Sequence, residues 1–261
     1  MSAPPAIAVL GLGEAGAAIA RDIVPIGNRV IGYDPVQPVP DGVEPAATAQ
    51  AAAAAARVVL SANTAAVAAE VAEAVAPALG EHHVYADLNT AAPALKRAIA
   101  ALIEPSGARF ADVALMEPVP DWGVRTPALA SGRGAEDFQR VFGAFGTPVT
   151  CVGDEPGAAA ARKLARSVFM KGQAAAIGEA LAAAERLGCE EWLYGDIEGT
   201  LTRADGRLLR RLVEGSRTHA ARRVDEMQAA VEMLEELDVE PRVSAASEAW
   251  LRSLAASQVG R

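Results

Sequence analysis

Three glycines near the start of the chain are spaced so that they could hold a phosphate group. Gly11, Gly13 and Gly16 follow the G-x-G-x-x-G spacing, after a short apolar run at 6–10 and before an alanine-rich stretch from Ala17. The first glycine permits a tight turn, the second lets a pyrophosphate approach the backbone, and the third lets a helix pack on a strand. Free N–H groups at the helix N-terminus then face the phosphates. This pattern predicts a dinucleotide site formed by Gly11, Leu12, Gly13, Glu14, Ala15 and Gly16; the alternative is a tight turn that binds nothing.

An acidic residue follows at the distance that such a site requires. Asp34 ends the stretch 29–34, which has the composition of a second strand, roughly 20 residues past the glycines. A carboxylate there accepts hydrogen bonds from the adenosine ribose and repels a 2′-phosphate, and residues 35–38 offer no arginine that would hold one. The expected cofactor is NAD or NADP, with NAD favoured by Asp34. Asp34-Pro35 is also an ordinary way to open a turn.

Lysine is rare in this chain, which makes each lysine a candidate for acid/base chemistry. Of 24 basic residues only Lys96, Lys163 and Lys171 are lysines. Arginine keeps its proton in a protein, whereas lysine can lose its proton when it is desolvated. The same pattern also follows from a simple compositional bias.

Composition excludes several classes of function. The net charge of −9 argues against a nucleic-acid partner, because phosphate binding at that scale needs a basic face. Cys151 and Cys189 are too few for a disulfide framework or a metal cluster, so no metal is expected. The N-terminus lacks a signal-peptide pattern, and no apolar run reaches the roughly 18 residues of a membrane span. We expect a cytoplasmic protein with a small-molecule substrate and no membrane partner.

Strands and helices alternate through the first part of the chain. The pattern predicts further strands at 57–61, 83–88, 109–115, 128–131 and 148–152, and helices at 64–79, 93–103 and 135–145. Such alternation is typical of an α/β fold with a doubly wound, mostly parallel sheet. Ligands bind beyond the carboxyl ends of its strands, where the stretches 61–64, 87–90 and 117–123 fall. We therefore assign Ala62, Asn63, Thr64, Asn89 and Thr90 to the cofactor site.

The pattern changes near residue 154. A helix is predicted from 156 to about 187, followed by helices at 190–202, 206–214, 218–237 and 244–256. We therefore expect a dinucleotide-binding Rossmann domain at 1–154 and an all-α domain at 155–261, joined by one long interdomain helix. So thin a helical domain, with many apolar positions, is expected to bury one face against a second copy, which gives a homodimer.

At this point the sequence resembles the β-hydroxyacid dehydrogenase superfamily, which includes 3-hydroxyisobutyrate dehydrogenases and 6-phosphogluconate dehydrogenase. The resemblance rests on residues 11–16, 87–93 and 157–163, and residues 219–227 resemble a subgroup with a C-terminal domain of unknown function. It implies hydride transfer between nicotinamide and a hydroxy acid or related alcohol, with Lys163 as the general acid/base. Ser167 stands where the family usually has an asparagine one turn later.

The segment that should bind substrate departs from the family. Pro118-Val119-Pro120-Asp121-Trp122 stands where Pro-Val-Ser-Gly-Gly is usual, so the serine hydroxyl is missing and an acid is present. His219, Arg222, Arg223 and Glu226 form one stripe of a predicted helix, which is either part of the cleft or a solvated, ion-paired face. The candidate substrate-binding residues are Pro118, Val119, Pro120, Trp122, Lys171, His219 and Arg223.

Two rival functions follow from the same residues. Imine reductases share this architecture and reduce C=N, but they typically lack the lysine, so Lys163 counts against them. The altered substrate segment also leaves open a sensor or scaffold that binds a dinucleotide without turnover.

Overall fold

The computed structural model of the chain describes residues 5–259, which form parts of two compact units. The first unit ends at Arg166 and the second begins at Ser167. The division lies within the long helix α7 (Ala158–Leu187). The predicted boundary near residue 154 falls between the last strand and the start of this helix.

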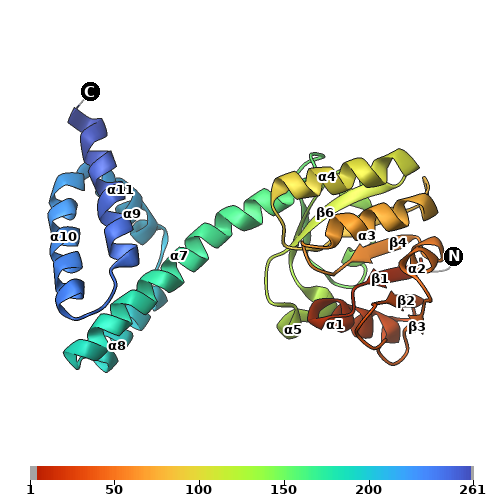
Figure 1. Cartoon of the computed structure of the whole chain (residues 1–261), viewed down its shortest axis with the longest axis horizontal. Helices are drawn as coiled ribbons and strands as arrows, with labels where there is room; N and C mark the ends of the chain where they lie inside the picture. The colour runs from red at the N-terminus through yellow and green to blue at the C-terminus, as the bar shows by residue number, and fades with distance from the viewer. Residues whose placement is uncertain (1–4, 260–261) are drawn as a thin grey trace. The chain divides into compact units, whose positions relative to one another are not determined.

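The first unit is built on one eight-stranded sheet in the order β3-β2-β1-β4-β5-β6-β7-β8 (Figure 1). Neighbouring strands are parallel except for the antiparallel pair β6 and β7. This confirms the predicted α/β fold with a doubly wound, mostly parallel sheet. The strands are β1 (Ile7–Leu10), β2 (Val30–Tyr33), β3 (Glu44–Pro45), β4 (Val58–Ser61), β5 (Val84–Asp87), β6 (Arg109–Leu115), β7 (Ala128–Ser131) and β8 (Val149–Cys151).

Helices cover both faces of this sheet because alternate strand residues point to opposite sides. Ile7 and Val9 of β1 pack in a core with Ile19 and Phe138, beneath the helices α1 and α6. Ala8 and Leu10 of the same strand belong to a second core beneath α2, α3 and α4. The helices are α1 (Glu14–Ile23), α2 (Ala49–Ala54), α3 (Ala68–Val75), α4 (Pro93–Ile103), α5 (Val119–Trp122) and α6 (Ala135–Gly143).

Several elements of the first unit differ from the expectation. β3 and α2 lie in residues 35–56, for which the sequence predicted no element. α2 begins because the Thr48 hydroxyl accepts a hydrogen bond from the Ala51 N–H at 3.1 Å. The helix expected at 64–79 begins only at Ala68, since residues 64–67 form a turn closed by the Val67 N–H on the Thr64 carbonyl.

The second unit is entirely helical, as predicted. After α7 come α8 (Glu190–Thr202), α9 (Gly206–Thr218), α10 (Ala220–Glu236) and α11 (Arg242–Val259). The Glu179 carboxylate of α7 accepts hydrogen bonds from the Val243 N–H at 2.7 Å and the Ser244 N–H at 2.9 Å, so it caps α11. Within residues 5–259, no helix has the length and apolar composition needed to cross a bilayer.

Phe138 offers a test of the core on the α1 side of the sheet. It is 1% exposed and stacks on Phe142 with ring centroids 4.3 Å apart. We expect Phe138→Ala to lower the free energy of unfolding by about 3–5 kcal/mol, because a buried cavity replaces the ring. Urea unfolding followed by circular dichroism measures this. The control is Val36→Ala at a side chain that is 81% exposed, and an equal, small effect of both changes would contradict the assigned core.

Candidate functional site

The glycine turn has one position with free space beside it. A Cβ on Gly11 would lie 2.5 Å from the Ala62 carbonyl oxygen, and a Cβ on Gly16 would lie 1.9 Å from the Gly11 carbonyl oxygen. Gly11 also has a φ of +99°, which favours glycine. The fold itself therefore requires these two glycines. A Cβ on Gly13 would meet nothing within 4 Å, so the space beside Gly13 is open to a ligand.

The start of α1 offers backbone donors to that space. Gly13 is the N-cap residue and no side chain caps the helix. The first N–H groups of a helix have no partner inside the helix, and the positive end of the helix dipole favours an anion there. Glu14 and Ala15 follow directly, and Glu14 is exposed. A pyrophosphate fits this arrangement of backbone donors.

Asp34 connects the glycine turn to the end of β2. Its Oδ2 accepts a hydrogen bond from the Leu12 N–H at 2.7 Å, and its Oδ1 accepts from the N–H groups of Val36 and Gln37, both at 2.8 Å. Partial burial alone would raise the pKa of Asp34, but the three backbone hydrogen bonds lower it below its ordinary value. The carboxylate is therefore charged at neutral pH, and in folds of this kind an acid at the end of the second strand accepts hydrogen bonds from a ribose.

Two asparagines meet beyond the ends of β4 and β5. The Asn89 side-chain amide donates to Asn63 Oδ1 at 3.0 Å and to the Ser61 hydroxyl at 3.2 Å. The Asn89 Oδ1 atom is buried and has no hydrogen-bond partner within the described residues. A buried acceptor without a partner fits a ligand that donates a hydrogen bond. With the open space at Gly13, it makes this edge of the sheet fit a dinucleotide.

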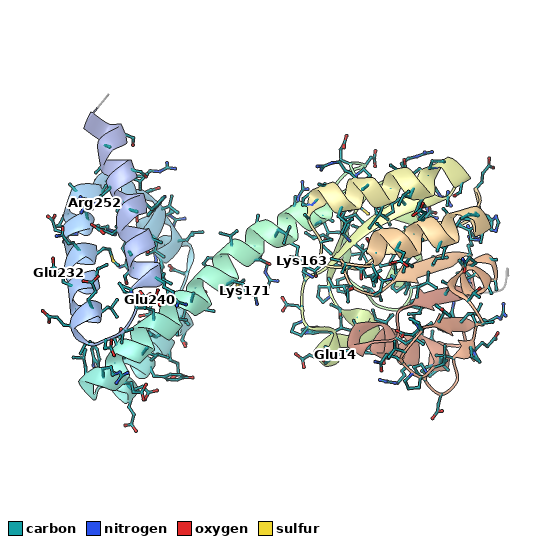
Figure 2. All side chains as sticks on the ribbon, viewed as in Figure 1. Glu14, Lys163, Lys171, Glu232, Glu240 and Arg252 are labelled. Carbon is teal, nitrogen blue, oxygen red and sulfur yellow. The ribbon has the colours of Figure 1, made fainter. Side chains whose placement is uncertain are left out.

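Lys163 lies at the same edge of the sheet. Its ammonium group donates a hydrogen bond to Thr90 Oγ1 at 2.9 Å, and Figure 2 shows Lys163 near the start of α7, with Lys171 further along the helix. Burial lowers the pKa of Lys163 below its ordinary value, and the positive charges of Lys96 and Arg166 lower it further. Arg166 itself donates to the Met116 carbonyl and pairs with Glu117 at 2.9 Å.

A buried ion cluster, Asp87, Lys96 and Asp112, lies behind these residues, and its place was not predicted from the sequence. The Lys96 ammonium lies 3.2 Å from Asp112 Oδ1 and 3.5 Å from Asp87 Oδ2. Burial is the largest effect on Asp87 and raises its pKa. The sequence did contain an indication that Lys96 is buried, because Lys96 lies on the same helical stripe as the buried Ile99 and Ile103.

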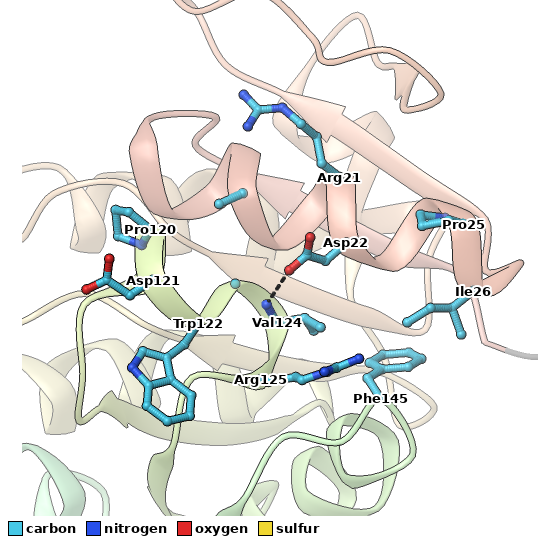
Figure 3. A pocket seen from close by; sticks show the side chains of 12 residues that line it. Arg21, Asp22, Pro25, Ile26, Pro120, Asp121, Trp122, Val124, Arg125 and Phe145 are labelled. Atoms are coloured by element: carbon cyan, nitrogen blue, oxygen red, sulfur yellow. Dashed lines mark hydrogen bonds between the residues drawn. The ribbon is translucent and has the colours of Figure 1, made fainter.

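The predicted substrate segment lines a hollow of its own. Residues 119–122 form α5, in which Val119 is buried and Trp122 is half exposed. The Asp22 carboxylate of α1 accepts a hydrogen bond from the Val124 N–H at 2.9 Å and ties the segment to that helix (Figure 3). Pro120 and Trp122 border a hollow of about 630 Å³ together with Arg21 and Arg125 of the same unit. Lys163 does not border this hollow; it borders a narrow space elsewhere in the unit with Asn89 and Thr90.

The remaining predicted residues lie in the second unit. Ser167 is half-buried and Lys171 is exposed, both on α7. His219 is exposed between α9 and α10, and Arg223 donates to the Ser216 hydroxyl. Arg222 pairs with Glu226 at 3.0 Å, which is the ion-paired face that the sequence left open as an alternative.

Comparison with known proteins identifies both parts of the chain. Residues 6–118 match the family model of the NAD binding domain of 6-phosphogluconate dehydrogenase. Residues 184–254 match the model of a domain of unknown function, DUF1932. A curated protein of 28.5 kDa from Methanothermus fervidus is 28% identical over 144 residues, which is 55% of each chain.

Solved structures extend the similarity over nearly the whole chain. A conserved hypothetical protein from Sinorhizobium meliloti 1021 is 32% identical, with 96% of this chain and 88% of that chain covered, at a TM-score of 0.65. A conserved protein described as structurally similar to 3-hydroxyacid dehydrogenases is 28% identical, with 97% and 98% covered and a TM-score of 0.63. An imine reductase from Myxococcus stipitatus in complex with NADP⁺ has a TM-score of 0.83 at 20% identity, with 97% and 95% covered. At that identity the similarity shows the fold alone.

The open space at Gly13 predicts a variant that folds but does not bind cofactor. We expect Gly13→Ala to leave the Tm unchanged and to raise the Kd of NADH and NADPH at least tenfold, about 1.4 kcal/mol. The added methyl group meets no protein atom but occupies the space beside the helix N-terminus. Calorimetric titration measures the Kd. Gly143→Ala, where a Cβ also meets nothing within 4 Å, is the control. Wild-type affinity in Gly13→Ala would place the phosphates elsewhere.

Proposed function

This chain belongs to the β-hydroxyacid dehydrogenase superfamily, with an NAD-binding domain of the 6-phosphogluconate dehydrogenase type followed by a DUF1932 domain, and we propose that Lys163 is its general acid/base. The reaction we propose interconverts a hydroxy acid, or a related alcohol, and the corresponding carbonyl compound. When bound, the nicotinamide cofactor accepts or supplies the hydride. Ser167, one turn beyond Lys163, is proposed to help orient the substrate.

The observation that carries this proposal is the 2.9 Å hydrogen bond from Lys163 to Thr90 at the end of β5. It puts a half-buried lysine at the edge of the sheet where ligands of this fold bind. The lowered pKa of Lys163 increases the neutral fraction of its amine. In the oxidation direction the neutral amine takes the proton of the substrate hydroxyl, and in the reduction direction the ammonium returns it.

We further propose that the cofactor is NAD rather than NADP. The charged Asp34 carboxylate at the end of β2 disfavours a 2′-phosphate. The N–H groups of Leu12, Val36 and Gln37 fix its position, so displacing it would break three hydrogen bonds. Residues 35–38 add no positive charge that would compensate.

Reduction of a C=N bond is the alternative reaction, because imine reductases share the fold. A lysine at position 163 favours chemistry on oxygen, since it supplies a group that can exchange a proton with a hydroxyl. A substrate panel therefore has to include cyclic imines beside hydroxy acids, sugar acids and alcohols. Turnover of imines alone would support the alternative and overturn the proposed reaction.

Replacing Lys163 tests its role directly. We expect Lys163→Ala to lower kcat by about 10²–10⁴-fold on the best substrate of the panel, which is the usual contribution of a general acid/base. Steady-state rates with NAD⁺ and with NADP⁺ measure this and the cofactor preference together. The control is Arg162→Ala at the preceding residue, whose exposed side chain donates to the Ala158 carbonyl of its own helix. Wild-type turnover in Lys163→Ala would contradict the role of Lys163 as general acid/base.

We also propose that the second unit pairs with a second copy of this chain. Leu209, Leu212 and Val213 form a stripe on α9, and their side chains are 62%, 53% and 49% exposed. Trp192 of α8 and Trp250 of α11 are also largely exposed. Apolar patches of this kind are typical of protein–protein contacts.

A charge in that stripe tests the pairing. We expect the wild type to have the mass of a dimer in solution and Leu212→Glu to have half that mass, because a carboxylate would be buried without a partner. Light scattering coupled to gel filtration measures the mass. Val36→Glu in the first unit, at a position that is 81% exposed, should leave the mass unchanged. A monomeric wild type would refute the proposal.

A further inference from the structure

The buried ion cluster lies behind the proposed site and takes no part in the proposed reaction. Lys96 is 1% exposed, and Asp87 and Asp112 are 0% exposed. Lys96 also donates a hydrogen bond to the Asp87 carbonyl oxygen at 2.9 Å. Burying an ion costs several kcal/mol even after the protein relaxes, so such a cluster is weak evidence for stability. Its contacts indicate another task.

Asp112 holds the start of α7. Its Oδ2 accepts hydrogen bonds from the Gly157 N–H at 3.1 Å and the Ala160 N–H at 3.0 Å. Ser131 Oγ donates to the same oxygen at 3.2 Å and accepts from the Ala159 N–H at 3.0 Å. N–H groups in the first turn of a helix have no partner inside the helix, and an anion there also interacts well with the dipole. The cap of α7 therefore comes from β6 and β7.

Asp87 holds the turn that carries Thr90. Its Oδ1 accepts hydrogen bonds from the Asn89 N–H at 2.9 Å and from the Asn89 side-chain amide at 2.6 Å. Lys96 lies between the two carboxylates and links this turn to the start of α7. Lys163 follows Ala160 by about one turn of helix. Both partners of the Lys163–Thr90 bond are thus fixed by the same cluster.

We propose that Asp112, neutralised by Lys96, is a positioning residue that places Lys163 against Thr90 and Asn89. The inference rests on the proposed function, because it assigns a task to the residues behind its acid/base. A neutral cap would also satisfy the first turn of α7, but it would leave Lys96 without its nearest carboxylate. The ion pair therefore favours one position of the first turn of α7 relative to β5 and β6.

The packing around Lys163 supports this inference. Lys96, Asp112, Thr90 and Lys163 border one narrow space, together with Asn89. The charge of Lys96 contributes to the lowered pKa of Lys163, after the larger effect of burial. If the first turn of α7 moved away from the sheet, Lys163 would become more exposed and its pKa would rise. The titration of the Lys163 amine therefore shows whether the residue is in place.

The three lysines of this chain make the test simple. Labelling with [ε-¹³C]lysine gives one NMR signal per lysine, assigned with Lys163→Arg and Lys171→Arg. In the wild type, Lys163 should titrate below the usual range of a lysine. In Asp112→Ala, the signal of Lys163 should move and its titration midpoint should rise toward that range. The kcat should fall about 10- to 100-fold, the expected effect of a small misplacement, while the Kd of NADH stays unchanged.

A carboxylate in the same unit provides the matched control. Asp137 pairs with Arg109 at 3.1 Å and with Arg140 at 2.7 Å, so Asp137→Ala removes ion pairs without touching α7. It should leave the Lys163 signal in place. A folded Asp112→Ala protein with a wild-type Lys163 signal would overturn the inference. If Asp112→Ala does not fold, Ser131→Ala, which removes one bridge to Asp112, must move the signal in the same direction, and an unmoved signal overturns the inference.

The NMR measurement needs no turnover, which separates this inference from the proposed function. A Lys163 signal that moves in Asp112→Ala, in a protein that turns over no substrate of the panel, would refute the proposed function and support the positioning role. A wild-type signal in Asp112→Ala, with activity lost in Lys163→Ala, would refute the positioning role alone.

Discussion

Four polar residues lie in register on the central strands of the sheet. The site depends on the hydrogen bonds and ion pairs that these residues make there. Ser61, Asp87, Asp112 and Ser131 stand opposite one another on β4, β5, β6 and β7. All four are fully buried, where an unpaired carboxylate would be very unfavourable. Lys96 enters from α4, backbone N–H groups come from α7, and Asn89 comes from the turn after β5. The interactions with these four residues therefore bring together the elements that carry Asn89, Thr90 and Lys163.

Most of the architecture could be predicted from the sequence because local patterns determine it. The strands at 109–115 and 128–131 and the helix at 93–103 have the predicted bounds, since apolar runs and Pro93 mark them clearly. The antiparallel pairing of β6 and β7 was not predicted, because strand direction depends on contacts between distant residues. β3 has two residues, too few for any periodicity. Such elements exist only through their tertiary neighbours.

The site, like the fold, could be predicted from the sequence only in part. The glycine turn and Asp34 could be found from spacing, because a single short segment builds them. The cluster of Lys96 and Asp112 could not, since its members are 16 positions apart and join only through the sheet and α4. Lys163 was singled out by resemblance and by the rarity of lysine, not by geometry. The sequence also gave no sign that Pro120 and Trp122 border a hollow beside α1.

Lys96 and Lys163 show that lysine can have two different roles in one site. Lys96 lies between two carboxylates and is almost fully buried, so its ammonium group has no access to solvent. Lys163 is half-buried beside Thr90, and burial, with a smaller contribution from the cations of Lys96 and Arg166, disfavours its charged form. The first lysine is suited to holding structure and the second to exchanging a proton. Access to the edge of the sheet where ligands bind, together with the groups around the amine, therefore distinguishes a structural ammonium group from a candidate acid/base.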